Sequence, residues 1–249
     1  MKILICLSNV PDTTTKIKLN ADKTAIDMSG VQWVINPWDE LALTRALDLK
    51  EKTGEMISQI TVITVGENLT EPTIRKALAV GADDAVRINM TPSDDYEVAF
   101  QIAEYVKENP YDIILSGIES SDYNGSAVGG MLAEFLKIPS VSSVSFLDLV
   151  DNQPLMKREI PGGTETVKVP LPFVAIVQKG IALDPRIPAM RGIMMARKKP
   201  LEVVEPKTIS AKSGFISFEM PKPKAKVKMI DAENAGTLIT LLHEEAKVI

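Results

Sequence analysis

The chain has 249 residues, of which 45% are hydrophobic and 24% charged, a composition typical of a globular protein with one large or two modest domains. Lys and Arg total 28 against 33 Asp and Glu, for a net charge of −5, which argues against a general nucleic-acid-binding protein because such a protein needs a basic surface. The single cysteine, Cys6, excludes a disulfide framework, and the single histidine, His243, argues against a histidine metal cluster or a Ser-His-Asp triad.

The first half of the chain alternates short apolar runs, typical of buried parallel strands, with amphipathic patterns typical of helices. Strands are predicted at residues 3–7, 60–65, 85–88 and 112–116, and helices at 39–52, 71–81, 94–107 and 129–136. This alternation predicts an α/β fold with a doubly wound, mostly parallel sheet.

After Pro139 the pattern changes to strands at 141–150, 154–159, 166–169 and 174–178, which we expect to form an antiparallel extension of the same sheet. Residues 198–228 are rich in proline and lysine and predict an extended arm, and residues 231–248 predict a terminal helix. We therefore divide the chain into an α/β domain over residues 1–200 and an arm with a C-terminal helix over residues 201–249. A helix on a long arm docks either on its own domain or on another chain.

The loops after Leu7, Val65 and Ser116 are the candidate ligand-binding segments, because ligands of open parallel sheets bind beyond the carboxyl ends of the strands. The loop from Gly117 to Gly130 is rich in small residues and leads directly into a predicted helix, whose free N–H groups and dipole favour a phosphate. Asp122 is placed either to cap the turn or to accept a hydrogen bond from a ribose hydroxyl. The alternative is an ordinary Gly/Ser loop that caps a helix.

Two other residues have simple structural interpretations. Asp39 is a candidate N-cap of the first helix, and Cys6 is a small apolar residue of a buried strand.

Neither the G-x-G-x-x-G pattern nor the G-x-x-x-x-G-K-[ST] loop is present, so generic NAD-binding and NTPase interpretations lose support.

Five segments carry a resemblance to a known family. In chain order they are VPD at 10–12, INP at 35–37, AVGAD at 79–83, KREIPGGTE at 157–165 followed by VPLP at 169–172, and DPRIPAMRGIMMARKKP at 184–200. Together they resemble the β subunit of electron-transfer flavoproteins over nearly the whole chain. The last string is the most specific of the five, because no common fold requires it.

The resemblance implies a heterodimer whose α subunit holds most of the FAD, while this chain braces that FAD and binds AMP in a fold related to adenine-nucleotide α-hydrolases. It implies an electron carrier without bond chemistry of its own. Its electrons come from dehydrogenases, such as the acyl-CoA dehydrogenases of fatty acid β-oxidation, and pass through FAD to a quinone oxidoreductase or another acceptor.

The resemblance also assigns residues. The nucleotide site takes in the end of the first strand, the entry to the first helix, the end of the second strand and the glycine-rich loop: Cys6, Asn36, Pro37, Trp38, Asp39, Val65, Gly117, Ile118, Glu119, Ser120, Ser121, Asp122, Tyr123, Asn124, Gly125, Ser126, Ala127 and Val128. Arg158 and Glu159 resemble the interface with the α subunit and the flavin. Met190 resembles the apolar anchor, commonly leucine, of a recognition loop at about 184–200 that binds dehydrogenases; methionine is a flexible apolar side chain, so anchoring should survive.

The identity of the ligand in the β subunit is left open by two features. Ser126-Ala127-Val128 stands where AMP-binding relatives commonly have Asn-Gln-Thr, so a threonine hydroxyl is lost. A valine at the position of Val128 also occurs in the electron-bifurcating branch of the family, whose β subunit binds a second FAD instead of AMP. The second feature, Val10-Pro11-Asp12-Thr13-Thr14, favours that branch too. Arg158-Glu159 followed by Gly162-Gly163 resembles the AMP type, which we expect here.

Two other classes are weighed against the electron carrier: a non-redox adenylate-binding module and an adenylating or nucleotide-hydrolysing enzyme, for which the chain offers no P-loop. The sequence contains no long apolar run and no recognisable signal peptide. We therefore expect a bacterial cytoplasmic protein that does not insert into membranes.

Overall fold

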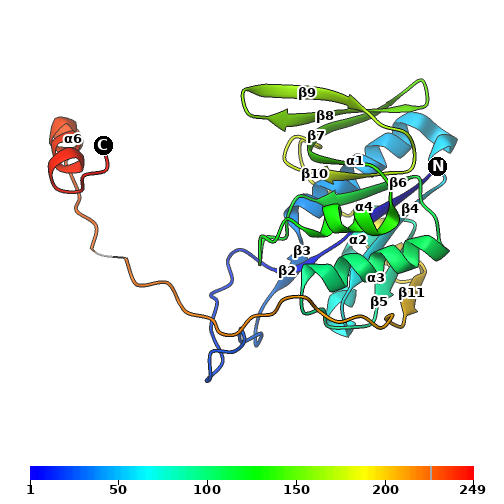
Figure 1. Ribbon diagram of the computed structural model, residues 1–249, viewed down its shortest axis with the longest axis horizontal. Helices are drawn as coiled ribbons and strands as arrows, with labels where there is room; N and C mark the ends of the chain where they lie inside the picture. The colour runs from blue at the N-terminus through cyan, green and yellow to red at the C-terminus, as the bar shows by residue number, and fades with distance from the viewer. Residues whose placement is uncertain (225) are drawn as a thin grey trace.

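A computed structural model describes residues 1–224 and 226–249 of the chain. Within these residues nine strands form one sheet in the order β11-β5-β4-β1-β6-β10-β7-β8-β9 (Figure 1). The strands are β1 (Lys2–Cys6), β4 (Gln59–Val65), β5 (Asp84–Ile88), β6 (Ile113–Gly117), β7 (Ser140–Val150), β8 (Gln153–Ile160), β9 (Gly163–Lys168), β10 (Phe173–Val177) and β11 (Leu201–Val204).

The predicted doubly wound parallel sheet is confirmed. Every pairing from β11 across to β7 is parallel, and only β7–β8 and β8–β9 are antiparallel. The expected antiparallel extension is therefore correct for β8 and β9 but wrong for β10, which lies between β6 and β7 and runs parallel to both. All five residues of β10 are buried, as in a central strand; the turn signals that mark where a strand ends do not determine its neighbours.

Helices cover both faces of the sheet. α1 (Pro37–Thr53) and α2 (Glu71–Val80) pack on one face, and α3 (Asp95–Glu108) and α4 (Val128–Leu136) on the other. Alternate residues of β1 supply the two layers of core: Ile3 and Ile5 face α1 and α2, whereas Leu4 and Cys6 face α3 and α4. Short 3₁₀ turns lie at Gly54–Met56, Asn68–Thr70 and Ala232–Asn234.

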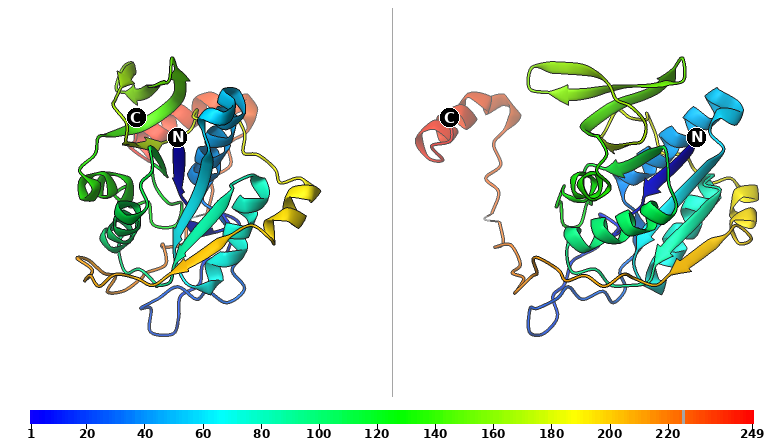
Figure 2. Two further views of the ribbon diagram at one scale, coloured as in Figure 1. Left: turned by 90° about the vertical axis from the view of Figure 1, so that its right-hand side faces the viewer. Right: turned by 45° about the vertical axis from the view of Figure 1, so that its right-hand side comes forward.

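Besides the 3₁₀ turns and β11, three elements were not predicted. β2 (Asn9–Pro11) and β3 (Trp33–Ile35) form a small antiparallel pair joined by a long loop, and α5 (Met190–Ala196) rests on α2 (Figure 2). These elements have three to seven residues, too few to produce a clear period in the sequence.

The C-terminal part leaves the domain in two steps. β11 lies inside the segment expected to be an arm; it pairs with β5 at the edge of the sheet, a position that tolerates neighbouring prolines. Residues 205–224 and 226–231 then contain neither helix nor strand. The terminal helix α6 (Ala235–Glu244) is shorter than predicted, has no buried residue and lies well away from the sheet (Figure 1). Among the described residues, no helix combines the length and the apolar character that a membrane span needs.

Candidate functional site

The order of the strands reverses between β1 and β6. From β1 the chain passes to β4 and β5 on one side, and then returns to place β6 on the other side of β1. Open α/β sheets bind ligands at such a reversal, outside the carboxyl ends of the strands. In this protein those ends lead into Ser8 and into the loop that begins at Gly117, and the N-terminus of α1 lies beside both.

Asp39 ties the two strand ends together. Its carboxylate accepts hydrogen bonds from the backbone N–H of Ser8 at 2.8 Å and of Gly117 at 3.0 Å. Burial raises the pKa of Asp39 to about 7. The hydrogen bonds act in the opposite direction, but the effect of burial is larger. The suggestion that Asp39 caps α1 is wrong: the helix begins at Pro37, its N-cap residue is Asn36, and Asp39 lies within the first turn.

Asn36 fastens the loop that follows β6. Its side chain is only 1% exposed; its Nδ2 donates to the carbonyl oxygen of Glu119 at 2.8 Å and its Oδ1 accepts from the N–H of Ser121 at 3.1 Å. Gly117 has no room for a side chain, because a Cβ there would collide with the carboxylate of Asp39 and lie 2.8 Å from the Cβ of Trp38. The start of α1 and the loop therefore form one interlocked unit.

The outer part of the loop is exposed and conformationally unusual. Asn124 and Ser126 have φ angles of 53° and 54°, in the left-handed region that costs a non-glycine residue on the order of 1 kcal/mol. The hydroxyl of Ser126 donates to the carboxylate of Glu119 at 3.3 Å. Such a loop keeps its shape only where its surroundings hold it.

α4 begins at Val128, directly after the loop, with no side-chain cap and no acidic residue in its first turn. The first N–H groups of the helix therefore retain hydrogen-bonding capacity, and the positive end of its dipole is not neutralised by its own sequence. Gly129 brings the helix close to the sheet, since a Cβ there would lie 2.7 Å from Ile176. The end of the loop therefore presents uncapped backbone N–H groups beside the predicted residues, and phosphate binding there stays a prediction.

Cys6 and Val65 complete this edge of the sheet from β1 and β4. Cys6 is 6% exposed, and burial, with a smaller contribution from the charge of Asp39, raises the pKa of its thiol far above the usual range. The thiol therefore stays protonated and packs as an apolar group. Val65, half-buried, is the last residue of β4 and packs against the α3–α4 layer of the core.

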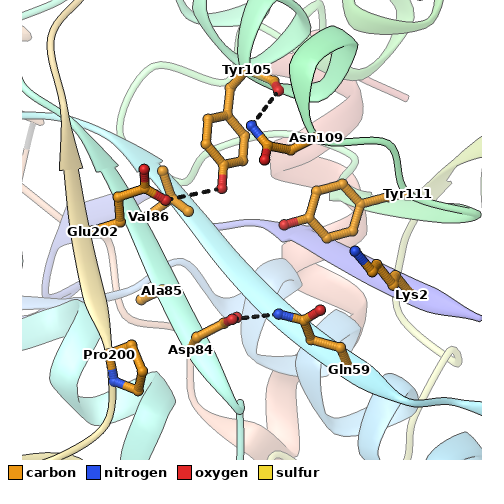
Figure 3. A pocket seen from close by; sticks show the side chains of 10 residues that line it. All are labelled: Lys2, Gln59, Asp84, Ala85, Val86, Tyr105, Asn109, Tyr111, Pro200 and Glu202. Atoms are coloured by element: carbon orange, nitrogen blue, oxygen red, sulfur yellow. Dashed lines mark hydrogen bonds between the residues drawn. The ribbon is translucent and has the colours of Figure 1, made fainter.

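Two cavities lie elsewhere. One of about 240 Å³ is at the opposite, amino-terminal edge of the sheet, where Tyr105 donates to Glu202 and Gln59 to Asp84 (Figure 3). The other, of about 440 Å³, is lined by the loop between β2 and β3. Neither is lined by a predicted nucleotide-site residue, and no His, Cys, Asp or Glu cluster suited to a metal ion occurs in residues 1–224 and 226–249.

Comparison with known proteins identifies the family. The sequence profile of the electron transfer flavoprotein domain matches residues 23–209. The chain is 35% identical to the electron transfer flavoprotein subunit beta of Bacillus subtilis, over 100% of both chains. This chain belongs to the electron transfer flavoprotein β-subunit family. It is also 34% identical to the corresponding protein of Syntrophomonas wolfei, covering 94% of this chain and 91% of that one, and 29% identical to the human protein, covering 100% and 99%.

The remaining predicted residues of this electron transfer flavoprotein β subunit lie apart from the β1–β6 edge. Arg158 and Glu159 are on β8, near the antiparallel edge of the sheet; Glu159 is exposed, and Arg158 donates to the hydroxyl of Ser142 at 3.3 Å. Met190 begins α5, on the outer side of α2. The structure therefore separates the predicted residues into three locations.

The segment that carries Met190 is attached by polar contacts between residues far apart in the sequence, which no motif predicts. Arg186 binds Asp48 and Glu51 of α1, with its Nη1 2.6 Å from the Glu51 carboxylate. Arg75 of α2 donates to the carbonyl oxygens of Ala196 and Lys199, both at 2.8 Å. Long-range contacts of this kind leave no local pattern in the sequence.

The end of the segment caps α2. The ammonium group of Lys199 donates to the carbonyl oxygens of Leu78 at 2.9 Å and Ala82 at 2.5 Å, so a cation stabilises the negative end of the helix. Gly192 allows α5 to approach α2 closely, because a Cβ there would collide with the carbonyl oxygen of Ala79. The segment is therefore fixed on its inner side.

Proposed function

We propose that this electron transfer flavoprotein β subunit pairs with an α subunit that holds FAD, binds AMP at the carboxyl ends of β1 and β6, and docks dehydrogenases through α5. In this role it performs no bond chemistry. Electrons arrive from dehydrogenases, such as acyl-CoA dehydrogenases, and leave for a quinone oxidoreductase or another acceptor, with the protein in a bacterial cytoplasm. FAD, when bound in the heterodimer, supplies the electron-accepting and electron-donating chemistry.

The observation that carries the proposal is the loop between β6 and α4. It lies where the strand order reverses, Asn36 fastens it, and it leads into a helix N-terminus that no side chain caps. The backbone N–H groups at the start of α4 would hold the phosphate of AMP, together with the hydroxyl of Ser126 once it exchanges its hydrogen bond to Glu119 for one to the phosphate. The adenosine would then lie along the strand ends that Cys6 and Val65 terminate.

A second FAD in the same place is the alternative, favoured by Val128 in place of a threonine. We prefer AMP because Arg158-Glu159 followed by Gly162-Gly163 resembles the AMP-binding subunits. Exposed Glu159 would face the α subunit near the flavin, where a carboxylate affects the flavin's redox potential and its retention.

The exposure of the C-terminal helix is an argument for assembly with another chain. Leu238 and Ile239 of α6 are 45% and 62% exposed, and no residue of α6 is buried. An amphipathic helix of this kind is stable only when its apolar face is covered. Because the sheet domain lies away from α6 (Figure 1), the α subunit is the expected partner.

The exposed apolar side chains of the recognition segment, at about residues 184–200, are an argument for docking of a third protein. Ile187, Met190 and Met194 are 90%, 76% and 70% exposed. Their backbone is fixed by the contacts of Arg186, Gly192 and Lys199, so these side chains face solvent because of the fold. A rigid, methionine-rich apolar surface is suited to binding several dehydrogenases.

Nucleotide counting tests the proposal. The chain is co-expressed with its α subunit, the complex is purified and denatured, and the released nucleotides are separated and quantified. We expect one FAD and one AMP per heterodimer. Two FAD and no AMP would establish the bifurcating alternative, and a colourless homodimer would establish the non-redox module.

A further inference from the structure

We propose that the arm, residues 205–218, holds the nucleotide-binding loop in shape, so that nucleotide binding and capture of the α subunit are thermodynamically coupled. This inference rests on the proposed function, because it takes residues 117–128 as the nucleotide-binding loop and the α subunit as the partner of α6. It adds a role for Phe215 and for the start of α3, which neither the sequence analysis nor the family assignment connects with the nucleotide.

The arm is first fixed on α3. The side chain of Gln101 is 2% exposed and makes two hydrogen bonds to the backbone of Lys207: its Nε2 donates to the carbonyl oxygen at 2.6 Å, and its Oε1 accepts from the N–H at 2.9 Å. This paired arrangement resembles one rung of a sheet and sets which arm residue lies beside α3.

Asp94 makes the second attachment. It is the N-cap of α3: Oδ1 accepts from the N–H of Glu97 at 2.9 Å, and Oδ2 accepts from the N–H groups of Lys212 and Ser213 at 2.6 and 2.8 Å. The ammonium group of Lys212 also lies 5.3 Å from the ring centre of Tyr96. One carboxylate thus joins the start of α3 to the arm.

The third attachment is to the loop itself. The ring of Phe215 stacks on the ring of Tyr123, with the centroids 4.9 Å apart and an interplanar angle of 29°. The ring centroid of Phe218 lies 5.1 Å from that of Phe215. The backbone N–H of Phe218 donates to the carbonyl oxygen of Lys23 at 2.8 Å. The arm therefore crosses from α3 over the exposed tip of the nucleotide loop to the loop between β2 and β3.

These contacts act at the part of the loop that needs external support. Tyr123 immediately precedes Asn124, and both Asn124 and Ser126 have positive φ angles. The start of α3 packs closely against the loop at Gly125, since a Cβ at this position would collide with the carboxylate of Asp95. Asn36 holds the inner half of the loop, while α3 and the arm hold the outer half.

α6, in which no residue is buried, follows the arm after residues 219–224 and 226–231, which contain neither helix nor strand. When α6 binds the α subunit, the arm becomes tethered at both ends and loses freedom to leave Tyr123. The preorganised loop then binds the nucleotide more tightly, and by reciprocity a bound nucleotide strengthens the association of the two subunits.

Phe215→Ala in the intact heterodimer tests the inference, with Ile216→Ala as the matched control because Ile216 is the next residue and is 91% exposed. AMP affinity is measured by titration calorimetry after removal of bound nucleotide. We expect Phe215→Ala to weaken AMP by about two- to tenfold, the range expected for loss of one aromatic stack, and Ile216→Ala to have no effect. Phe215→Tyr retains the stack and should restore affinity.

Two further measurements separate positioning from a general loss of structure. Tyr123→Ala and the double variant Phe215→Ala/Tyr123→Ala should each match Phe215→Ala, since all three lose the same stack, and FAD content should stay unchanged in all of them. AMP should tighten subunit association in the wild type and do so less in Phe215→Ala. Unchanged AMP affinity in Phe215→Ala, or additive effects in the double variant, overturns the inference; a wild-type heterodimer that does not bind AMP overturns the proposed function instead.

Discussion

The ionisation of Asp39 gives the sharpest quantitative prediction. The carboxyl is 2% exposed, and burial raises its pKa from 3.8 to about 7 in the folded chain. Between these two pH values the folded state binds more protons at this group than the unfolded state does. The contribution of Asp39 to the free energy of unfolding therefore falls as the pH rises from about 4 to 7, by on the order of 4 kcal/mol in total, and then levels off.

Asp39→Asn removes the charge and keeps the shape. The carboxylate of Asp39 accepts one hydrogen bond from the N–H of Ser8 and one from the N–H of Gly117. Since asparagine has a single acceptor oxygen, one of these two N–H groups loses its partner in the variant. That loss costs about 1–3 kcal/mol at every pH. The pH-dependent loss disappears in the variant, so its free energy of unfolding should improve relative to wild type by about 3 kcal/mol between pH 5 and pH 8.

Guanidinium chloride unfolding of the heterodimer, followed by circular dichroism at pH 5 and pH 8, measures this difference. Protein concentration is held constant because subunit association contributes to the apparent stability. Asp151→Asn, in the exposed turn between β7 and β8, is the control; because it retains Asp39, its free energy of unfolding should fall between pH 5 and pH 8 as the wild-type value does. If wild type and Asp39→Asn keep the same difference at both pH values, Asp39 does not ionise as the buried geometry requires.

Four further substitutions test the site and the proposed docking surfaces. Asn36→Ala leaves two backbone groups of the loop without partners and should lower stability by about 2–5 kcal/mol and AMP affinity at least tenfold; unchanged calorimetric affinity would contradict the loop assignment. Gly117→Ala places a methyl group against Asp39 and should reduce co-purifying AMP while leaving FAD in place, whereas full AMP occupancy would contradict the packing. Met190→Ala should raise the KM of a partner dehydrogenase for this protein, without affecting assembly, and Met28→Ala should not; equal kinetics for both would remove α5 from the docking surface. Glu159→Gln should change the midpoint potential or the retention of FAD, and unchanged values for both would place Glu159 away from the flavin.

Much of the fold could be predicted from local pattern. Apolar runs such as β4 and the alternation with helices gave the parallel sheet and its two helical layers. The position of β10 could not be predicted in this way, because the strand is specified by a run of buried apolar residues and its neighbours by tertiary packing. β11 was missed for a related reason: beside prolines, four residues gain strand structure only from pairing with the exposed edge of β5.

The candidate site likewise has parts that local sequence patterns predict and parts that depend on tertiary packing. The loop from Gly117 onward could be selected as a candidate from sequence because a strand, a Gly/Ser loop and a helix in succession are local signals. The interlock through Asn36 joins residues 83 and 85 positions apart, and the support from Phe215 comes from an arm for which the composition predicts only an extended chain. Contacts across such distances depend on how the elements pack.

In the proposed recognition segment, polar contacts fix the backbone and leave apolar side chains exposed. A helix as short as α5 cannot bury its apolar residues on both sides, and on its inner side only Ala196 is buried. Arg186, Arg75 and Lys199 attach the segment instead, through ion pairs and helix-end carbonyl groups. Since these contacts fix the backbone without using the long apolar side chains, Met190 and Met194 remain available to a partner. Exchanging Arg186 for methionine should therefore impair dehydrogenase docking even though it adds apolar surface, because the anchors would lose their fixed orientation.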